Sequence, residues 1–230
     1  MNEKSWDKVK QGTLRQAVWQ SVRQAIINGD LMPGTQINQA ALADKLGVSR
    51  GPLREALSQL EEEGLVKNIQ YRGTFVADLD IQVIEEVYSV RDVLEQFAVE
   101  RAVRNATPAQ KAELHAIYEN MLAADRQQDI RAFYREDLAF HRQLYCMADN
   151  AVLLEMWKML EGHVQRGIFY GTFAYQIYTT SELNEEHKRI LEAVENDDPD
   201  TAKREIHHHV TEAVTRLKMR WEALQTDSPS

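Results

Sequence analysis

The stretch ALADKLGVSRGPLREALSQLEEEGLV, residues 41–66, decides the fold of the front part of the chain. Its beginning predicts a short helix that ends at Gly47 within about two turns. A second helix follows at once, because the Ser49 side chain can accept a hydrogen bond from a free amide of the new first turn and Pro52 stands early enough to be tolerated. Two helices joined by so short a turn predict a helix-turn-helix.

The second of these helices is amphipathic and leads into a predicted β-hairpin. Gly64 ends the helix, and two short apolar stretches then flank a polar tip at 68–73, as in a hairpin. Another amphipathic helix, over 14–27, precedes the pair. Residues 1–78 are therefore predicted to form a winged helix-turn-helix domain with a small β-hairpin wing. The expected buried stripe of the second helix is Leu53, Ala56, Leu57 and Leu60.

Two arginines lie on the outer side of that second helix. Arg50 and Arg54 are one turn apart and beside the apolar stripe, so both side chains are expected to point outward together. A guanidinium can bind a guanine edge or a phosphate, and Arg72 and Tyr71 at the hairpin tip are placed to reach neighbouring phosphates or the minor groove. The acidic run 61–63 at the far end would repel a phosphate backbone. A solvated surface charge explains any one arginine better, but their shared placement favours DNA binding.

Composition and charge place this domain within a larger globular chain. The chain has 230 residues, 43% of them hydrophobic, which suits one or two packed domains. Residues 1–78 hold 10 Lys+Arg and 9 Asp+Glu, net +1, whereas 79–230 hold 17 and 27, net −10, so a boundary near 78–80 is expected. The single Cys146 forms no internal disulfide. Without a signal peptide or an apolar run of about 18 residues, a cytoplasmic protein with no membrane partner is expected.

Residues 79–230 are predicted to form an all-α antiparallel helical bundle, so the chain as a whole is expected to be mainly α. Helical periodicity dominates this segment, and five breaks divide it into six helices. Thr107 and Gln110 have the spacing of a capping box at one break, and Asp198 before Pro199 is a good cap at another. The segment contains no alternating strand pattern, phosphate-binding glycine loop or nucleophile turn.

Four polar residues interrupt the apolar stripes of these helices, where burial without a partner is costly. They are Asp137, His141, His187 and His209. Neutral imidazole favours Zn, Ni, Fe or Cu, and a carboxylate broadens the choice of metal. A core histidine that bonds a neighbouring side chain is the commoner explanation of any one of them. Together they predict a divalent metal site, with Zn as the first choice and Ni, Mn or Fe as alternatives.

Arg91 lies on the apolar face of the first helix of this segment, where an unpaired guanidinium would be costly. An internal ion pair with Glu95 or Asp92 and a contact with a small effector explain it equally well. A carboxylate held between the metal and Arg91 would satisfy both charges. Further candidates for effector contacts, each of which could equally be packing or surface, are Tyr134, Arg142, His163 and Arg166.

The stretch at 41–66, preceded by INGDLMPGTQI and followed by YRGTFV, resembles the DNA-binding domain of GntR-type bacterial transcription regulators. The resemblance implies that Arg50 and Arg54 on the recognition helix contact operator DNA, together with the wing. Gly51 departs from the family pattern, because it stands where Thr or Gln is frequent and offers no side chain to a base. The full set of predicted DNA-contact residues is Ser49, Arg50, Gly51, Arg54, Tyr71, Arg72 and Gly73.

The helical segment resembles the FCD ligand-binding domain found in the FadR subfamily of these regulators. REDLAFHRQL supplies the Asp-x-x-x-His pair of that domain, and EEHKRILEAVENDDPDTAKREIHHHV supplies two further histidines. The resemblance therefore implies metal binding by all four of the residues proposed above. YSVRDVLE resembles the first helix of the domain, whose arginine, here Arg91, often faces the effector. In some members water and the effector's carboxylate complete the metal shell.

These features predict a homodimeric transcription regulator in a family whose members mostly repress. Two-fold symmetric dimers bind palindromic operators, and the effector would act by shifting the orientation of the two DNA-binding domains. Two other interpretations of the cluster stay open, namely a sensor for which the metal itself is the signal and a metal-dependent hydrolase. The hydrolase is disfavoured because Glu186, the carboxylate beside His187, points about 100° away from it on the helix.

Overall fold

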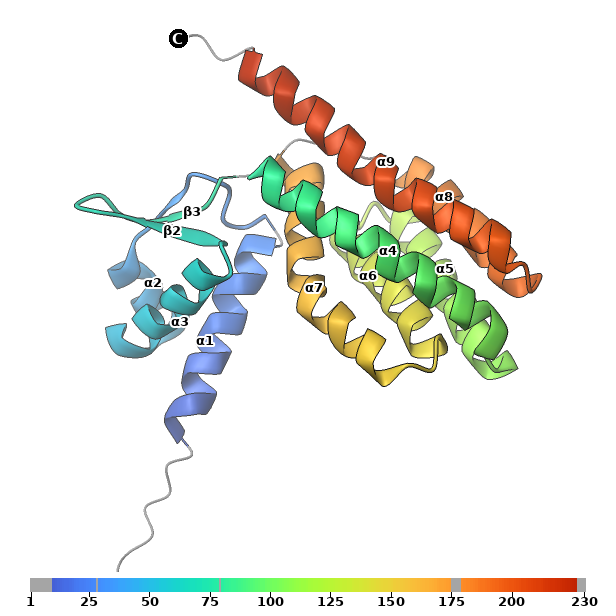
Figure 1. The fold of residues 1–230 in the computed structure, drawn as a ribbon. Helices are drawn as coiled ribbons and strands as arrows, with labels where there is room; N and C mark the ends of the chain where they lie inside the picture. Colours follow the sequence, from blue (N-terminus) through green and yellow to red (C-terminus); the bar gives the residue numbers. More distant parts are fainter. Residues whose placement is uncertain (1–9, 28, 79, 175–178, 227–230) are drawn as a thin grey trace, which may run out of the picture. The chain divides into compact units, whose positions relative to one another are not determined.

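The computed structural model describes residues 10–27, 29–78, 80–174 and 179–226, and it is mainly helical, as predicted (Figure 1). The chain forms two compact units, Met1–Leu79 and Asp80–Ser230. The elements of the first unit are α1 (Lys10–Ile27), β1 (Gln36–Ile37), α2 (Gln39–Leu46), α3 (Arg50–Glu62), β2 (Val66–Ile69) and β3 (Gly73–Val76). Those of the second are α4 (Ile81–Asn105), α5 (Pro108–Arg126), α6 (Ile130–Met147), α7 (Ala151–Phe169), the π-helix η1 (Tyr170–Ala174), α8 (Thr180–Glu195) and α9 (Pro199–Thr226).

Local signals at their ends set the bounds of α2 and α3. The Asn38 side chain accepts hydrogen bonds from the first amides of α2, and Gly47 ends that helix with a left-handed φ of 65°. Ser49 has the extended backbone of an N-cap at the start of α3, but its side chain makes no capping hydrogen bond. The prediction of a Ser49 cap bond is therefore wrong. The hydroxyl lies on the exposed surface, where water competes for it.

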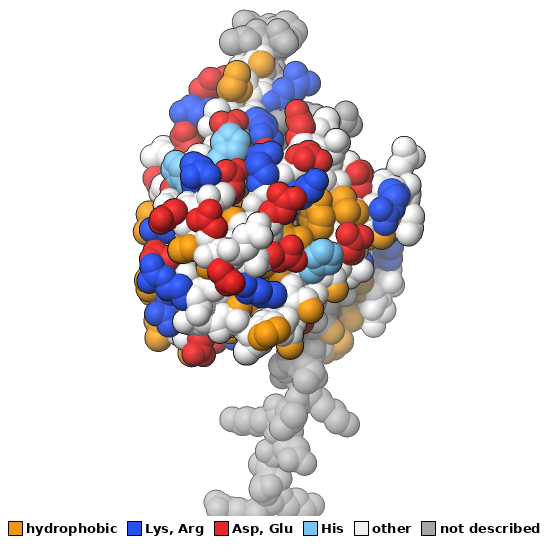
Figure 2. Space-filling model, turned by 90° about the vertical axis from the view of Figure 1, so that its right-hand side faces the viewer, with side chains coloured by type: hydrophobic (Ala, Val, Ile, Leu, Met, Phe, Trp, Pro, Cys, Tyr) orange, Lys and Arg blue, Asp and Glu red, His pale blue; other side chains and the backbone are white. Residues whose placement is uncertain are grey.

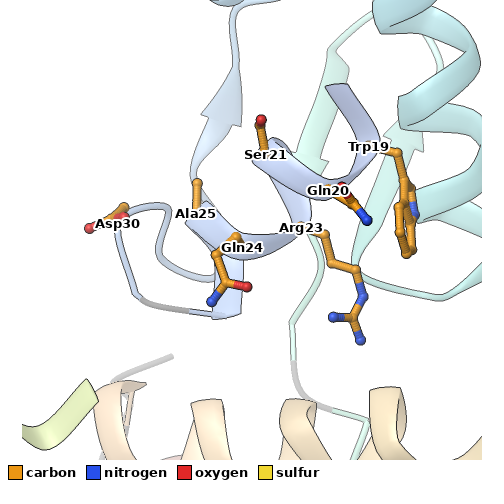
Figure 3. Close-up of a pocket in the computed structure, with 7 residues that line it drawn as sticks. All are labelled: Trp19, Gln20, Ser21, Arg23, Gln24, Ala25 and Asp30. Atoms are coloured by element: carbon orange, nitrogen blue, oxygen red, sulfur yellow. The ribbon is translucent and has the colours of Figure 1, made fainter. Parts of the chain in front are cut away.

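The predicted stripe of α3 packs against α1. The buried side chains of this contact are Leu53, Ala56, Leu57 and Leu60 from α3 and Val18, Val22 and Ile26 from α1. Just beyond α3, the Glu63 carboxylate accepts hydrogen bonds from Nε1 of Trp19 at 2.7 Å and from Nε of Arg23 at 3.3 Å. Trp19 and Arg23 also line the hollow beside α1 that Figure 3 shows. One member of the acidic run thus fastens the end of α3 to α1.

The wing has three strands, whereas the sequence predicts two. β3 pairs antiparallel with both β1 and β2, so the strand order is β1-β3-β2. β1 is only two residues long, too short for an alternating pattern to appear in the sequence. The tip is also shorter than predicted, because Asn68 and Ile69 belong to β2. At the tip, Tyr71 adopts a φ of 63° and is 98% exposed.

All six predicted helices of the second unit are present. Thr107 and Gln110 form the predicted capping box, and the Asp198 side chain accepts a hydrogen bond from the amide of Thr201 at 3.0 Å. The sequence pattern does not predict η1, which continues α7 for five residues. Single π-helical turns of this kind often lie beside functional sites.

The core of the second unit includes a cluster of aromatic and aliphatic side chains between α4, α6 and α7. Trp157 on α7 is fully buried and stacks on Tyr145 of α6, with ring centroids 5.0 Å apart. Gly167 on α7 permits a close approach of α4, since a Cβ at that position would lie 2.7 Å from Oη of Tyr88. Within the same unit, α9 packs along α4 (Figure 1). This packing brings α4, α6, α8 and α9 around one buried region.

The surface carries both signs of charge. Acidic and basic side chains are interspersed on the face drawn in Figure 2. Several acids of the second unit pair with a basic side chain from another helix, such as Asp197 with Lys111 and Glu205 with Arg189. These pairs take up part of the negative charge of this unit. Among the helices in the described ranges, none is long and apolar enough to cross a membrane.

Candidate metal centre and DNA-contact residues

Four side chains from three helices meet inside the second unit. Asp137 and His141 lie one turn apart on α6, His187 lies on α8 and His209 lies on α9. All four are buried, and one potential ligand atom from each lies within 4.8 Å of the others. The centroids of the three imidazole rings are 4.6, 5.0 and 5.4 Å apart. The structure thus brings together the four residues predicted as a metal site.

Hydrogen bonds fix which nitrogen of each imidazole ring faces the others. Nδ1 of His141 lies 2.7 Å from Oε2 of Glu95, and Nδ1 of His209 lies 2.8 Å from Oε2 of Glu186. Nδ1 of His187 lies 2.7 Å from a backbone carbonyl oxygen of its own helix. Carbonyls and carboxylates only accept, so each Nδ1 carries the proton and donates it. Nε2 is therefore the nitrogen of each ring that faces the cluster and could bind a metal.

These inward-facing atoms are crowded in a way that suits a bound cation. Nε2 of His141 and Nε2 of His209 are 3.2 Å apart. Nε2 of His187 lies 3.1 Å from Oδ1 of Asp137, without the geometry of a hydrogen bond. Buried lone pairs that face one another are unfavourable unless something positive lies between them. Three imidazole nitrogens and one carboxylate, each imidazole held from behind by an acceptor, therefore fit a divalent metal such as Zn²⁺.

The charges around the cluster favour the protonation states that bind a metal. Burial disfavours the ionised form of Glu95, but Arg91 and His141 outweigh it and lower its pKa to about 2. Burial is the main cause that lowers the pKa of His209, to about 4. The His209 ring is therefore neutral at pH 7, and neutral imidazole is the form that coordinates metal.

In chelator-treated protein, we expect the free energy of unfolding to fall as the pH is lowered from about 6.5 to about 4. The pKa of His209 is 6.5 before burial and about 4 after it, so in this window the unfolded chain binds a proton that the folded chain does not. The stability is present above the upper value and is lost on acidification, by about 3 kcal/mol for this residue. Burial also lowers the pKa of His141, which adds to the loss.

Urea unfolding in EDTA at pH 7.0 and pH 4.5 measures this loss. His209→Gln replaces the titrating ring by a neutral side chain, so its unfolding free energy should change less between the two pH values than that of the wild type. Equal changes in the two proteins would show that burial does not lower the pKa of His209.

Arg91 is buried on α4 beside the cluster. Its Nε donates to Oε1 of Glu95 at 2.5 Å, and its Nη2 lies 3.0 Å from Nε2 of His141. Its guanidinium carbon lies 5.1 Å from the centroid of the Tyr88 ring. Of the two predicted ion-pair partners, the one that Arg91 contacts is Glu95, while Asp92 bonds with a histidine of α9. The internal ion pair is thus present, and contact with an effector stays a prediction.

The other predicted effector residues differ in burial. Tyr134 on α6 and Arg166 on α7 are buried, and His163 on α7 is half-buried. Arg142 is exposed, because it follows the buried His141 and adjacent residues of a helix point about 100° apart. The structure therefore does not bring Arg142 into the buried cluster. Effector contacts by the other three stay predictions.

Two carboxylates hold histidines of the cluster although the sequence pattern does not assign them to it. Glu95 stands one turn after Arg91 on the same buried face, which was a usable signal for its burial. The sequence contains no such signal for Glu186, because its partners His209 and Arg216 lie on another helix. Burial opposes ionisation of Glu186, but these two partners outweigh it and lower its pKa to about 2. Both Glu186 oxygens are engaged, so this side chain orients His209.

The predicted DNA-contact residues lie at the surface of the first unit. Arg50 and Arg54 are exposed on α3, beside its buried stripe. Tyr71 and Arg72 are exposed at the wing tip, where the guanidinium carbon of Arg72 lies 5.9 Å from the centroid of the Phe75 ring. Ser49 and Gly73 are exposed as well, and Gly51 is half-buried. The arrangement leaves both arginines of α3 accessible, and contact with DNA stays a prediction.

Two family models match the chain. The model of bacterial regulatory proteins of the gntR family matches residues 14–76, and the model of the FCD domain matches residues 86–212. The chain belongs to the GntR family and carries an FCD domain. All four residues of the candidate metal centre lie within the FCD match. This family consists of transcription regulators and not of enzymes, which removes the hydrolase interpretation.

The names of similar proteins agree with this assignment to the GntR family, and a solved structure shares the fold. The chain is 29% identical to an uncharacterized HTH-type transcriptional regulator, YdhC, of Bacillus subtilis, over 87% of this chain and 89% of the relative. It is 30% identical to a probable D-xylose utilization operon transcriptional repressor of Paenarthrobacter nicotinovorans, over 80% of each. The solved structure of McbR/YncC of E. coli has the same fold, with a TM-score of 0.73 and 24% identity over 90% of this chain and 98% of that one.

Proposed function

We propose that this GntR-family protein is a homodimeric repressor whose binding to palindromic operator DNA is controlled by a small carboxylate effector bound beside a metal ion. The observation that carries the proposal is the buried cluster of one aspartate and three histidines in the FCD domain. The similar protein of P. nicotinovorans, named as a probable repressor, supports the direction of regulation.

The DNA-binding part of the proposal is supported by the start of α3. Its first turn has no side-chain cap, so its amides are left for an anion, and a helix N-terminus favours phosphate. Arg50 and Arg54 are exposed within the first two turns of this helix. Near the opposite end, Glu61 accepts a hydrogen bond from the amide of Asn68 and Glu63 binds α1. Only the N-terminal end of α3 therefore suits entry into a groove.

The effector part of the proposal is supported by the charges around the cluster. Asp137, His141, His187 and His209 would hold the metal, preferably Zn²⁺, which would attract an anionic group of the effector. Arg91, buried at the edge of the cluster, would hold the same anion from the other side. Tyr134, His163 and Arg166 are the remaining candidates for contacts with the rest of the molecule.

The homodimer is supported by apolar side chains that two packed helices, α4 and α7, expose. On each helix they stand at spacings of three, four or seven residues, so they form a stripe on one face. The stripes are Val90, Val93 and Phe97 on α4 and Val152, Met156 and Met159 on α7, each between 44% and 78% exposed. Exposed apolar side chains grouped in this way are typical of interaction sites, and a second copy of the chain would cover them.

Replacing Arg54 by Ala is expected to reduce the discrimination between operator and unrelated DNA by about 1 to 3 kcal/mol, because it removes a contact to a base edge. Replacing Arg72 by Ala should instead weaken binding to all sequences alike and reduce the salt slope by about one, because it removes a phosphate contact. Selection from a random DNA pool, followed by gel-shift titration at several salt concentrations, measures both. Arg135→Ala, an exposed arginine of the other unit, is the control.

The same selection tests the proposal as a whole. A palindrome bound by two chains is expected, and the failure to enrich any palindrome would contradict it. Titrating the chelator-treated protein on its operator with Zn²⁺ alone, and then with organic acids, separates the effector-responsive regulator from a metal sensor. A complete response to the metal alone would favour the sensor.

A further inference from the structure

Arg91 contacts the same nitrogen that a metal would use. We infer that Arg91 and the metal compete for Nε2 of His141, so that metal binding must come first and releases one edge of the guanidinium for an anion. This inference rests on the proposed metal site and adds an order of events to it. It concerns Arg91 itself, whose interaction with His141 the sequence pattern does not predict.

The protonation state of His141 makes the two interactions exclusive. A guanidinium has five N–H donors and no acceptor, so at 3.0 Å from Nη2 of Arg91 the His141 Nε2 must be the acceptor. Nδ1 of the same ring is bound to Glu95 at 2.7 Å, which leaves the ring a single lone pair. A metal ligand must offer that lone pair to the ion. The contact with Arg91 and coordination of the metal therefore cannot coexist.

Displacing Arg91 from His141 does not leave its charge unpaired. Its Nε still donates to Oε1 of Glu95 at 2.5 Å, and its guanidinium still lies 5.1 Å from the centroid of the Tyr88 ring. Once a metal binds His141, Nη2 of Arg91 loses Nε2 of His141 as its acceptor. Arg91 is only 2% exposed, so water does not readily replace that acceptor. A buried N–H of a charged group that lacks an acceptor is costly, so the freed edge favours a small anion such as a carboxylate.

The direction in which Arg91→Met changes the Zn²⁺ affinity shows whether Arg91 competes with the metal or supports its binding. If Arg91 competes with the metal, Arg91→Met removes the competitor, and Zn²⁺ should bind about 10- to 100-fold more tightly, the range expected for a lost hydrogen bond to a charged group. If Arg91 only steadies Glu95 and His141, the same variant should bind Zn²⁺ more weakly. Competition against a chelator of known affinity gives the Zn²⁺ dissociation constant. A constant that is unchanged or raised in Arg91→Met overturns the inference.

Two further variants make this result specific. Arg104→Met removes a cation from the exposed end of the same helix, so it should leave Zn²⁺ affinity unchanged and shows that loss of charge on α4 is not the cause. Arg91→Lys keeps a positive charge beside the buried Glu95 carboxylate, so the variant is expected to fold. It lacks the planar guanidinium, whose separate N–H groups contact Glu95 and His141 at the same time. It should tighten Zn²⁺ binding by less than Arg91→Met, and weaker binding than in the wild type would count against competition.

The order of events is tested on the wild type with sodium acetate as the anion. Calorimetry is expected to show acetate binding to the Zn²⁺-loaded protein and at least tenfold weaker binding to the EDTA-treated protein. Equal binding to both would refute the order. If the wild type takes up no metal at all, the proposed function fails together with this inference. If it takes up metal that Arg91→Met does not bind more tightly, the inference fails alone.

Discussion

Adding Zn²⁺ to the chelator-treated wild type is expected to raise its thermal unfolding midpoint by about 10 °C, whereas His187→Ala/His209→Ala should not respond. A ligand that binds only the folded state at about 1,000 times its dissociation constant adds about 4 kcal/mol. For a chain of this size, each kcal/mol corresponds to roughly 2 to 4 °C. The double variant removes two of the four candidate ligand atoms. These are the two through which the metal would link α8 and α9 to α6. Scanning calorimetry with and without Zn²⁺, combined with elemental analysis, measures both effects.

The chain offers a matched control for the Zn²⁺ prediction. His207 and His208 are adjacent to His209 on α9 and are exposed, so His207→Ala/His208→Ala removes two histidines without touching the cluster. This variant should respond to Zn²⁺ like the wild type. An equal rise in the His187→Ala/His209→Ala variant would show that the metal binds elsewhere, and no rise in the wild type would contradict the metal site altogether.

Trp157→Ala is expected to lower the free energy of unfolding by about 3 to 5 kcal/mol, the largest effect of any single substitution considered. Trp157 is the largest fully buried side chain among the described residues, and its ring stacks on Tyr145. The alanine leaves a cavity between α6 and α7 that the rigid helices cannot close. Urea unfolding in EDTA measures the loss without a contribution from metal, which matters because Trp157 lies 6.2 Å from His141 between ring centroids.

Trp157→Phe separates packing from hydrogen bonding at the same site. Nε1 of Trp157 has no hydrogen-bond partner within the part of the chain that the structure describes. Trp157→Phe therefore loses only part of the buried side-chain volume, and it should lower the free energy of unfolding clearly less than Trp157→Ala does. If the two variants were equally destabilised, the indole N–H would have a partner in solution, and the cavity argument would be insufficient.

Most of the helix-turn-helix could be predicted because its determinants are local in sequence. Gly47 ends α2 with a left-handed φ, and the apolar stripe of α3 repeats at helical spacing. Two features were missed, for different reasons. β1 pairs with a strand almost forty residues later, and it is too short to show an alternating pattern in the sequence. Ser49 occupies the N-cap position of α3, but its side chain makes no capping hydrogen bond. A residue preference indicates where a helix begins, but it does not determine whether the N-cap side chain accepts a hydrogen bond from a backbone amide.

The four residues of the candidate metal centre could be predicted for a different reason. A histidine or aspartate on an apolar stripe is visible in the sequence, because the period of the helix tells which face is buried. Asp137 and His141 satisfy this test on α6. Arg142 fails it, since it is the neighbour of a buried residue and is exposed. Periodicity thus selects the face on which a residue lies, and it gives no distance between residues of different helices.

The sequence by itself determined the mainly helical fold, its six C-terminal helices and the inward-facing position of the four candidate metal ligands, since all of these follow from spacing along one segment at a time. Only the tertiary structure decided which side chains contact the histidines of the cluster: Glu95 bonds with Nδ1 of His141, Glu186 bonds with Nδ1 of His209, and Arg91 contacts Nε2 of His141. The physical reason is that hydrogen bonds act over about 3 Å between atoms, whatever their separation along the chain. Such partners exist only once the helices have packed.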